Sequence, residues 1–303
     1  MMEIGVCGVF SDDQVARLRQ GAGDLPVRLV AAHEPCDCAI VFGNPDPEMV
    51  VANANLRWMQ LESVGFGEYA GLDRARSHGD IVVTNLAGFF ADPVAESALA
   101  GVLALYRGID RLVGLQAQKR WVGDPIRTGL RVLRGARVVL FGYGAINQRL
   151  ADLLGPFGCA ITPITRAGGL EALDSALADA DLVVCTAPST PATAGLFGVA
   201  RLATMRQGTV FCNFGRGSIL DEDALADALE TGRLGGAVID VTRDEPLPAQ
   251  HRFWTCPNII LTQHSGGGTM DELDRKIDVF LANLARFRAG APLEGIVNFS
   301  RGY

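Results

Sequence analysis

The chain has 303 residues, of which 49% are hydrophobic and 20% charged, a composition typical of one large or two ordinary globular domains. Its formal net charge of −7 excludes nucleic acid and anionic membranes as main partners, and an anionic substrate needs a local positive site. The opening MMEIGVCGVF lacks the basic start of a signal peptide and is too short to span a membrane. We interpret it as a first strand.

Alternating strand-like and helix-like segments in the first third predict a small doubly wound domain. The expected strands are residues 4–10, 27–31, 38–43, 57–62 and 81–85, and the expected helices are residues 11–20 and 71–79. A long helix is expected over 92–118, with Asp92 as N-cap and Pro93 in its first turn. It is expected to bridge two domains, and a loop follows at 121–129.

A second alternating series begins at Arg137. Its expected strands are 137–141, 159–165, 181–187, 209–214, 235–241 and 258–262, with helices at 145–158, 170–179, 199–205 and 221–232. This is the Rossmann pattern, and a last helix at 270–289 is expected to return to the first domain. The fold class is therefore α/β with two doubly wound domains. A Rossmann cofactor domain, 97–269, is inserted in a smaller flavodoxin-like substrate domain, 1–96 with 270–303.

The cysteines indicate reduced thiols and no metal site. Cys7, Cys185 and Cys212 lie within apolar strand-like runs, while Cys36 and Cys38 form a C-x-C without a second pair or a histidine cluster. Reduced thiols are typical of a cytoplasmic protein.

The stretch FGYGAINQRL resembles the phosphate-binding turn of a dinucleotide site. Gly142 allows the tight turn, and Gly144 lets the backbone approach a pyrophosphate at the start of a helix. Asn147 stands where a third glycine would pack helix against strand. We expect Asn147 to disturb that packing and to leave cofactor binding intact.

The choice of cofactor is decided at the end of the next strand, in ITPITRAGG. An NAD site usually has an acid there for the ribose hydroxyls, whereas this chain has Thr165 and Arg166. A guanidinium can hold a 2′-phosphate with two hydrogen bonds. We therefore hypothesise a preference for NADP(H), with NAD(H) also possible; the alternative interpretation is that Arg166 is an ordinary solvated side chain.

Candidate catalytic residues follow three later strands. Arg216, Glu245 and His264 stand in CNFGRGS, DVTRDEPL and ILTQHSGG, and loops after strand ends form the ligand-binding edge of an open α/β sheet. Arginine can clamp a carboxylate, and a histidine paired with a carboxylate is suited to proton transfer. Beside a nicotinamide, these groups make a hydride-transfer site for a 2-oxo or 2-hydroxy acid.

These three segments resemble, in order, motifs of the D-isomer-specific 2-hydroxyacid dehydrogenase family. VAESALAGVLALYR resembles its domain-linking helix and ESVGFGEY its substrate loop, while the terminal RGY resembles the glyoxylate/hydroxypyruvate reductase branch. The resemblance implies that His264 protonates the carbonyl oxygen, that Glu245 orients His264, and that Arg216 binds the substrate carboxylate. It also implies products of D configuration and a homodimer.

The resemblance further places substrate and cofactor around named residues. The substrate carboxylate is expected at the backbone N–H groups of Val64, Gly65 and Phe66, beside Arg216 and His264. The cofactor is expected to contact Gly142, Tyr143, Gly144, Ala145, Ile146, Thr165, Arg166, Ala187, Pro188, Phe214, Gly215 and Asp240.

Some residues depart from the family pattern or stand outside it. Gln263 replaces the usual proline before the catalytic histidine. Phe89 and Phe90 indicate an apolar side-chain pocket, which leaves larger 2-oxo acids open beside glyoxylate and hydroxypyruvate. The remaining histidines, His33, His78 and His251, are interpreted as surface or loop residues.

Two alternatives to a 2-oxo-acid reductase stay open. One is a dehydrogenase for another small anion, such as formate or phosphite. The other is an NAD(H)-sensing corepressor that keeps the fold; the retention of Arg216, Glu245 and His264 speaks against it.

Overall fold

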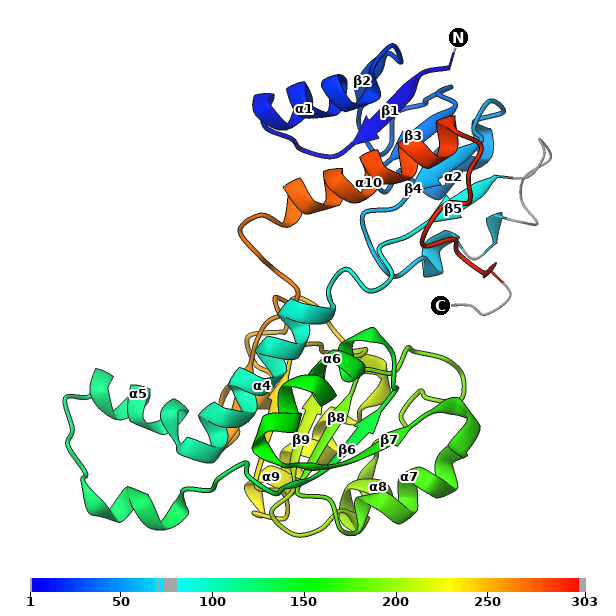
Figure 1. The fold of residues 1–303 in the computed structure, drawn as a ribbon. Helices are drawn as coiled ribbons and strands as arrows, with labels where there is room; N and C mark the ends of the chain where they lie inside the picture. Colours follow the sequence, from blue (N-terminus) through cyan, green and yellow to red (C-terminus); the bar gives the residue numbers. More distant parts are fainter. Residues whose placement is uncertain (1, 70, 73–80, 300–303) are drawn as a thin grey trace. The chain divides into compact units, whose positions relative to one another are not determined.

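The computed structural model describes residues 2–69, 71–72 and 81–299. The chain divides into two compact units, residues 1–89 with 269–303 and residues 90–268 (Figure 1). The division after Phe89 precedes the expected boundary at residue 96. The reason is that α4 (Ala91–Arg107) packs within the second unit, where Val94, Ala95 and Ala98 join the core.

The first unit contains a parallel five-stranded sheet in the order β2-β1-β3-β4-β5, the flavodoxin-like order. Its strands are β1 (Ile4–Cys7), β2 (Val27–Val30), β3 (Ile40–Phe42), β4 (Trp58–Gln60) and β5 (Val82–Thr84). The α-helices among its described residues are α1 (Asp12–Ala22), α2 (Pro47–Ala52) and α10 (Glu272–Arg288). Helix α2 was not expected from the sequence. Most of the helix expected over 71–79, His78 and the terminal RGY lie outside the described residues.

The C-terminal helix α10 returns to this sheet, as predicted. The ring of Phe280 stacks on Phe42 and Trp58, with centroids 4.6 and 5.4 Å away. The side-chain amide of the buried Asn283 donates to Oε1 of Gln60 at 2.9 Å. Aromatic packing and a satisfied buried amide thus fix the helix to the sheet.

The second unit contains a parallel six-stranded sheet in the order β11-β10-β9-β8-β6-β7, so the six predicted strands are confirmed. They are β6 (Arg137–Phe141), β7 (Ala160–Ile164), β8 (Leu182–Cys185), β9 (Val210–Asn213), β10 (Gly236–Ile239) and β11 (Ile259–Leu261). The covering helices are α4, α6 (Ala145–Leu154), α7 (Gly169–Leu177), α8 (Val199–Thr204) and α9 (Glu222–Glu230). Because all strands are parallel, their carboxyl ends share one edge.

Alternate residues of these strands build two core layers. Val138 and Leu140 pack in the layer of α4 and α6, whereas Val139 and Phe141 pack in the layer of α7, α8 and α9. A strand buried on both faces is expected to be apolar throughout, which is why RVVLF has no polar alternation. The order in which strands are added to the sheet reverses between β6 and β8, the switch point where ligands bind in such sheets.

The single helix predicted over 92–118 is wrong. Gly108, with φ of 64°, ends α4, and α5 (Ile109–Ala117) begins directly after it. A short 3-10 helix, Asp124–Gly129, then stands where a loop was expected.

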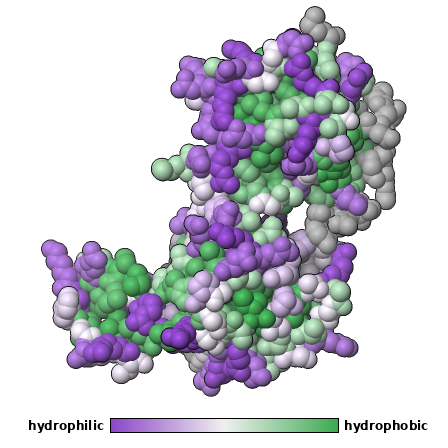
Figure 2. Space-filling model, viewed as in Figure 1, coloured by the Kyte–Doolittle hydropathy of each residue, from purple (hydrophilic) through white to green (hydrophobic). Residues whose placement is uncertain are grey.

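Residues 108–130, here called the arm, extend away from the sheet of this unit (Figure 1). Apolar side chains gather on the arm in Figure 2, and those exposed are Ile109, Leu112, Val113, Trp121 and Val122.

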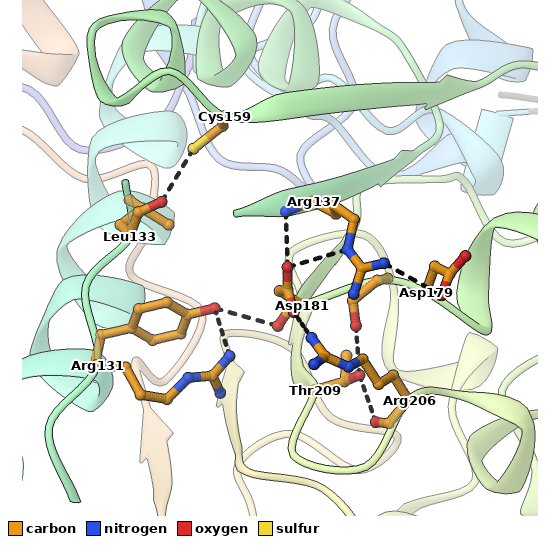
Figure 3. Close-up of polar contacts among 10 residues, drawn as sticks. Arg131, Leu133, Arg137, Cys159, Asp179, Asp181, Arg206 and Thr209 are labelled. Carbon is orange, nitrogen blue, oxygen red and sulfur yellow. Dashed lines mark hydrogen bonds and ion pairs between the residues drawn. The ribbon is translucent and has the colours of Figure 1, made fainter. Parts of the chain in front are cut away.

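An ionic cluster fixes the amino-terminal edge of the second sheet (Figure 3). Asp181 accepts from the backbone N–H of Arg137 at 2.9 Å and pairs with the guanidinium of Arg206. Burial alone would raise the pKa of Asp181, but these hydrogen bonds and charges outweigh it and lower that pKa. The cluster lies at the strand ends opposite to the phosphate turn, so its role is to stabilise the fold.

The cysteines are free thiols. Burial raises the pKa of Cys7 to about 11 and that of Cys185 to about 12, which leaves both protonated and unreactive at neutral pH. Among the residues described, no group of three or more His, Cys, Asp or Glu side chains could hold a metal ion. In the same part of the chain, no helix is long and apolar enough to cross a membrane.

Candidate active site

The phosphate turn joins the end of β6 to the start of α6. Gly142 has φ of 83°, and a Cβ there would lie 2.7 Å from the backbone nitrogen of Ala187, so only glycine fits. At Gly144, by contrast, a Cβ would meet nothing within 4 Å, and this residue is exposed. The N-terminal N–H groups of α6 are therefore open to an anion, which fits a dinucleotide pyrophosphate.

Asn147 is fully buried and turned toward the sheet. Its amide donates to the carbonyls of Phe141, Gly142 and Val184 at 3.3, 3.1 and 3.4 Å. The side chain thus replaces the close packing of a glycine with polar contacts to the turn and to β8. Its own Oδ1 is buried without a partner among the described residues, a cost that partly offsets those contacts.

Several predicted cofactor residues meet at this edge. The backbone N–H of Gly142 donates to the carbonyl of Ile164, the last residue of β7. Thr165 and Arg166 follow directly and are exposed. After β9, a Cβ on Gly215 would lie 2.5 Å from the carbonyl oxygen of Ala187. The segments that follow β6, β7, β8 and β9 therefore lie side by side.

Glu245 and His264 form a close pair at the ends of neighbouring strands. Oε2 of Glu245 lies 2.6 Å from Nδ1 of His264, and its Oε1 accepts from the N–H of Thr242 at 2.9 Å. Burial would raise the pKa of Glu245, but the bonds from His264 and Thr242, with the charges of His264 and Arg216, lower it. The carboxylate is therefore ionised at neutral pH and holds Nδ1 of the imidazole.

A strained turn presents His264. Gln263 and His264 both have φ of 53°, the left-handed region that side chains other than glycine seldom adopt. Asp240 fixes this turn: its carbonyl accepts from His264 at 2.6 Å, and its Oδ1 accepts from Thr262 and Gly266 at 2.6 and 3.0 Å. A proline cannot reach φ of 53°, so Gln263 is compatible with this backbone where the family's usual proline is not.

Arg216 follows β9 and is exposed. Its guanidinium donates to the carbonyl of Gly215 at 2.7 Å. The side-chain amide of Asn213 donates to the backbone carbonyl of Arg216 at 3.0 Å. Its positive charge contributes to the lowered pKa of Glu245. Arg216, Glu245 and His264 thus come from successive strand ends at the same edge of one sheet.

The predicted substrate loop belongs to the first unit. Asn85 donates to the carbonyl of Val64 at 2.7 Å, and the hydroxyl of Ser63 donates to that of Gly65 at 2.8 Å. Among the residues that the structure describes, none accepts from the N–H groups of Val64, Gly65 or Phe66. The loop is therefore held by its carbonyls, and its amides are available to an anion.

Comparison with known proteins identifies the chain. The sequence model of the "D-isomer specific 2-hydroxyacid dehydrogenase, NAD binding domain" matches residues 99–266, more than half of its length. The chain belongs to this family. As a D-isomer specific 2-hydroxyacid dehydrogenase, it is an NAD(P)-dependent oxidoreductase.

Relatives of this dehydrogenase include reductases of small oxo acids. The glyoxylate/hydroxypyruvate reductase A of Yersinia enterocolitica is 27% identical, covering 89% of this chain and 88% of that protein. The glyoxylate reductase of Thermofilum pendens is 30% identical, covering 84% and 78%. A crystal structure of a family member from Xanthobacter autotrophicus Py2, in complex with NADPH and MES, has a TM-score of 0.80 and 27% identity and covers 100% of both chains.

For two residues near the candidate site of this dehydrogenase, the sequence did not indicate a role in the site. His251, interpreted as a surface or loop residue, has a side chain only 22% exposed and lies 3.3 Å from Glu222. Glu222 in turn accepts from the N–H of Arg243 at 2.7 Å. The acid stands in the same RGSILDE stretch as Arg216, but its partner is remote in sequence, so no local spacing points to the pair.

Phe89 and Phe90 do not share one environment. The guanidinium of Arg275 lies over the ring of Phe89, 4.6 Å from its centroid, within the first unit. Phe90 belongs to the second unit, where a Cβ on Gly267 would lie 2.8 Å from its ring. The apolar side-chain pocket expected from Phe89 and Phe90 stays a prediction.

Proposed function

We propose that this dehydrogenase reduces a small 2-oxo acid, such as glyoxylate, hydroxypyruvate or a larger homologue, to the D-2-hydroxy acid with NADPH. The contact that carries this proposal is the 2.6 Å pair between Nδ1 of His264 and Glu245. Because Glu245 engages Nδ1, the proton that reaches a substrate comes from Nε2. A carboxylate-held histidine of this kind is a general acid for a carbonyl oxygen.

The other side chains bind and polarise the substrate. Arg216 offers a planar fork of N–H donors that matches a carboxylate, and its charge draws electron density from the adjacent carbonyl. Glu245 keeps its negative charge at neutral pH, so it holds the protonated imidazole in one orientation. In the first unit, the N–H groups of Val64, Gly65 and Phe66 supply a further anion-binding turn.

The cofactor assigned to the phosphate turn supplies the hydride when it is bound. The open N-terminus of α6 at Gly144 would hold its pyrophosphate, and Asp240 would line its nicotinamide end. Exposed Arg166, in place of an acid after β7, favours NADP(H), since it can bind a 2′-phosphate. NADPH in the Xanthobacter structure supports the same choice.

The arm supports assembly as a homodimer. Helix α5 buries none of its residues, and Trp121 is 96% exposed. Exposed apolar side chains gathered on one projection are typical of a protein–protein interface. We assign the arm to contact with a second copy of the chain.

A substrate panel tests the proposed reaction. Purified enzyme is assayed for loss of NADPH absorbance with glyoxylate, hydroxypyruvate, pyruvate and phenylpyruvate, and then with NADH. We expect turnover with at least one acid and faster turnover with NADPH at equal low concentration. Formation of NADH from NAD+ with formate or phosphite, without turnover of any of the oxo acids, would indicate another small-anion dehydrogenase. Tight NADH binding without turnover would instead indicate a sensor.

A variant tests the proposed acid. His264→Ala should abolish turnover while NADPH still binds, as measured by quenching of protein fluorescence. Retained turnover would contradict the role of His264.

A further inference from the structure

A second carboxylate–imidazole pair, Glu222 with His251, contacts the loop that carries Glu245. We propose that Glu222 is a positioning residue for the reaction, which it serves by fixing the peptide to which Glu245 is hydrogen-bonded. The inference rests on the proposed function of Glu245.

The orientation of Glu245 depends on its own loop. Its Oε1 accepts from the N–H of Thr242 at 2.9 Å, while Oε2 holds His264. A displacement of Thr242 would therefore turn the carboxylate away from the imidazole. The position of the peptide group between Thr242 and Arg243 thus determines how Glu245 is oriented toward His264.

That peptide is fixed from two sides. On one side, Oε1 of Glu222 accepts from the N–H of Arg243 at 2.7 Å. On the other, a Cβ on Gly217 would lie only 2.0 Å from the carbonyl carbon of Thr242, so the backbones touch and only glycine fits. Gly217 directly follows Arg216, so the loops that carry Arg216 and Glu245 are in contact.

Glu222 is itself firmly held. It is the first residue of α9, whose N-cap Asp221 accepts from the N–H of Ala224 at 3.1 Å. Its second oxygen lies 3.3 Å from Nε2 of His251. Nδ1 of His251 accepts from the N–H of Phe253 at 3.2 Å, which places the ring proton on Nε2, toward Glu222.

The pair is shielded from water. The side chains of Glu222 and His251 are 12% and 22% exposed, which strengthens a charged hydrogen bond compared with an exposed one. The catalytic partners Glu245 and His264 are 37% and 55% exposed. The better-shielded pair therefore provides a rigid support for the more accessible one.

Kinetics of Glu222→Ala test this role. A misplaced Glu245 should lower kcat roughly ten- to a hundredfold, with KM for NADPH unchanged because the phosphate turn is not touched. Glu222→Gln keeps an oxygen that accepts from Arg243 and should retain most of the activity. Asp223→Ala is the matched control, because Asp223 is the next acid of α9, is 84% exposed and pairs only with Arg252 among the described contacts; its kcat should equal that of the wild type.

A double-mutant cycle separates positioning from general stability. In a Glu245→Gln background, Glu222→Ala should cause no further loss, because its effect acts through Glu245. The inference would be overturned if Glu222→Ala kept the wild-type kcat, or if it lowered kcat in the Glu245→Gln background by the same factor as in the wild type. Either result would leave the proposed function standing. Unchanged kcat in Glu245→Gln alone would overturn both. Should Glu222→Ala not fold, Glu222→Asp replaces it, because its shorter side chain draws the acceptor oxygen away from the N–H of Arg243; a wild-type kcat in that variant would overturn the inference.

Discussion

The side-chain amide of Asn147 donates to the carbonyl of Gly142 at 3.1 Å, which ties the first turn of α6 to the phosphate turn. Asn147→Gly removes this bond and two others and adds a flexible residue to a helix. We expect a loss of about 2 kcal/mol in the free energy of unfolding. The Kd for NADPH should change little, because the amide faces the sheet.

Urea unfolding and NADPH titration check this prediction side by side. Asn147→Ala is the companion variant, since it removes the same bonds without the flexibility of glycine. A large gain in NADPH affinity with Asn147→Gly would mean that Asn147 obstructs the cofactor, contrary to its position.

Arg166 is predicted to select the cofactor. Arg166→Ala should raise KM for NADPH about ten- to a hundredfold, since a charge-assisted contact to the 2′-phosphate contributes roughly 1.5–3 kcal/mol. KM for NADH should stay nearly unchanged. Steady-state kinetics with both cofactors measure the ratio. An equal rise for both cofactors would show that Arg166 supports the loop and does not bind the phosphate.

The fold was predictable because its elements carry strong local signals. The inner strands of the second sheet, β6, β8, β9 and β10, are apolar runs such as DLVVCTA, and burial on both faces demands that pattern. The break at Gly108 was not predictable, since helical periodicity continues into α5. One glycine is tolerated within a helix, so only the three-dimensional context shows that this one is left-handed.

The candidate site was predictable where residues follow strand ends, and not where they meet through side chains. Arg216, Glu245 and His264 stand in the loops that follow β9, β10 and β11, and parallel strands bring such loops to one edge. Glu222 reaches Arg243 across 21 positions of sequence. Asn147 looked like a packing defect because the sequence does not show that three carbonyls surround it.

The pH dependence of reduction should follow the protonation of His264. Reduction consumes a proton from the imidazole, so turnover falls as the pH rises. The lowered pKa of Glu245 means that its charge persists to acidic pH. Glu245→Gln removes the charge that favours the imidazolium, so the alkaline fall should move to lower pH.

A kcat profile between pH 5 and about 9 for both forms measures this shift, within the range where histidine titrates. Asp244→Asn, at the adjacent acid, is the control and should leave the profile unmoved. An alkaline limb of Glu245→Gln that coincides with the wild type would separate Glu245 from the proton transfer.

Asp181 should stabilise the fold in a pH-dependent way (Figure 3). Its folded pKa is lowered below the unfolded value of about 3.9. Its contribution is therefore complete well above that value and is lost as the pH falls toward the folded pKa. Asp181→Asn should cost about 1–3 kcal/mol at neutral pH, and the difference from the wild type should shrink below about pH 4.

Urea unfolding at several pH values checks the sign of this effect. Asp179→Asn is the matched control, because Asp179 pairs with the same Arg137 at 3.2 Å but is 80% exposed. Exposed pairs contribute little, so this variant should resemble the wild type. A difference for Asp181→Asn that grows as the pH falls would contradict the assignment.

The arm should hold two copies of the chain together. Val113→Asp places a charge among the exposed apolar side chains of α5, where Val113 itself is 59% exposed. Burial of an unpaired carboxylate at an interface is unfavourable, so this variant should be monomeric at concentrations where the wild type is dimeric. Val199→Asp is the control, because Val199 is 68% exposed on α8 and lies outside the arm. Light scattering coupled to gel filtration measures both masses. A wild-type monomer, or equal dissociation by both substitutions, would contradict an interface formed by the arm.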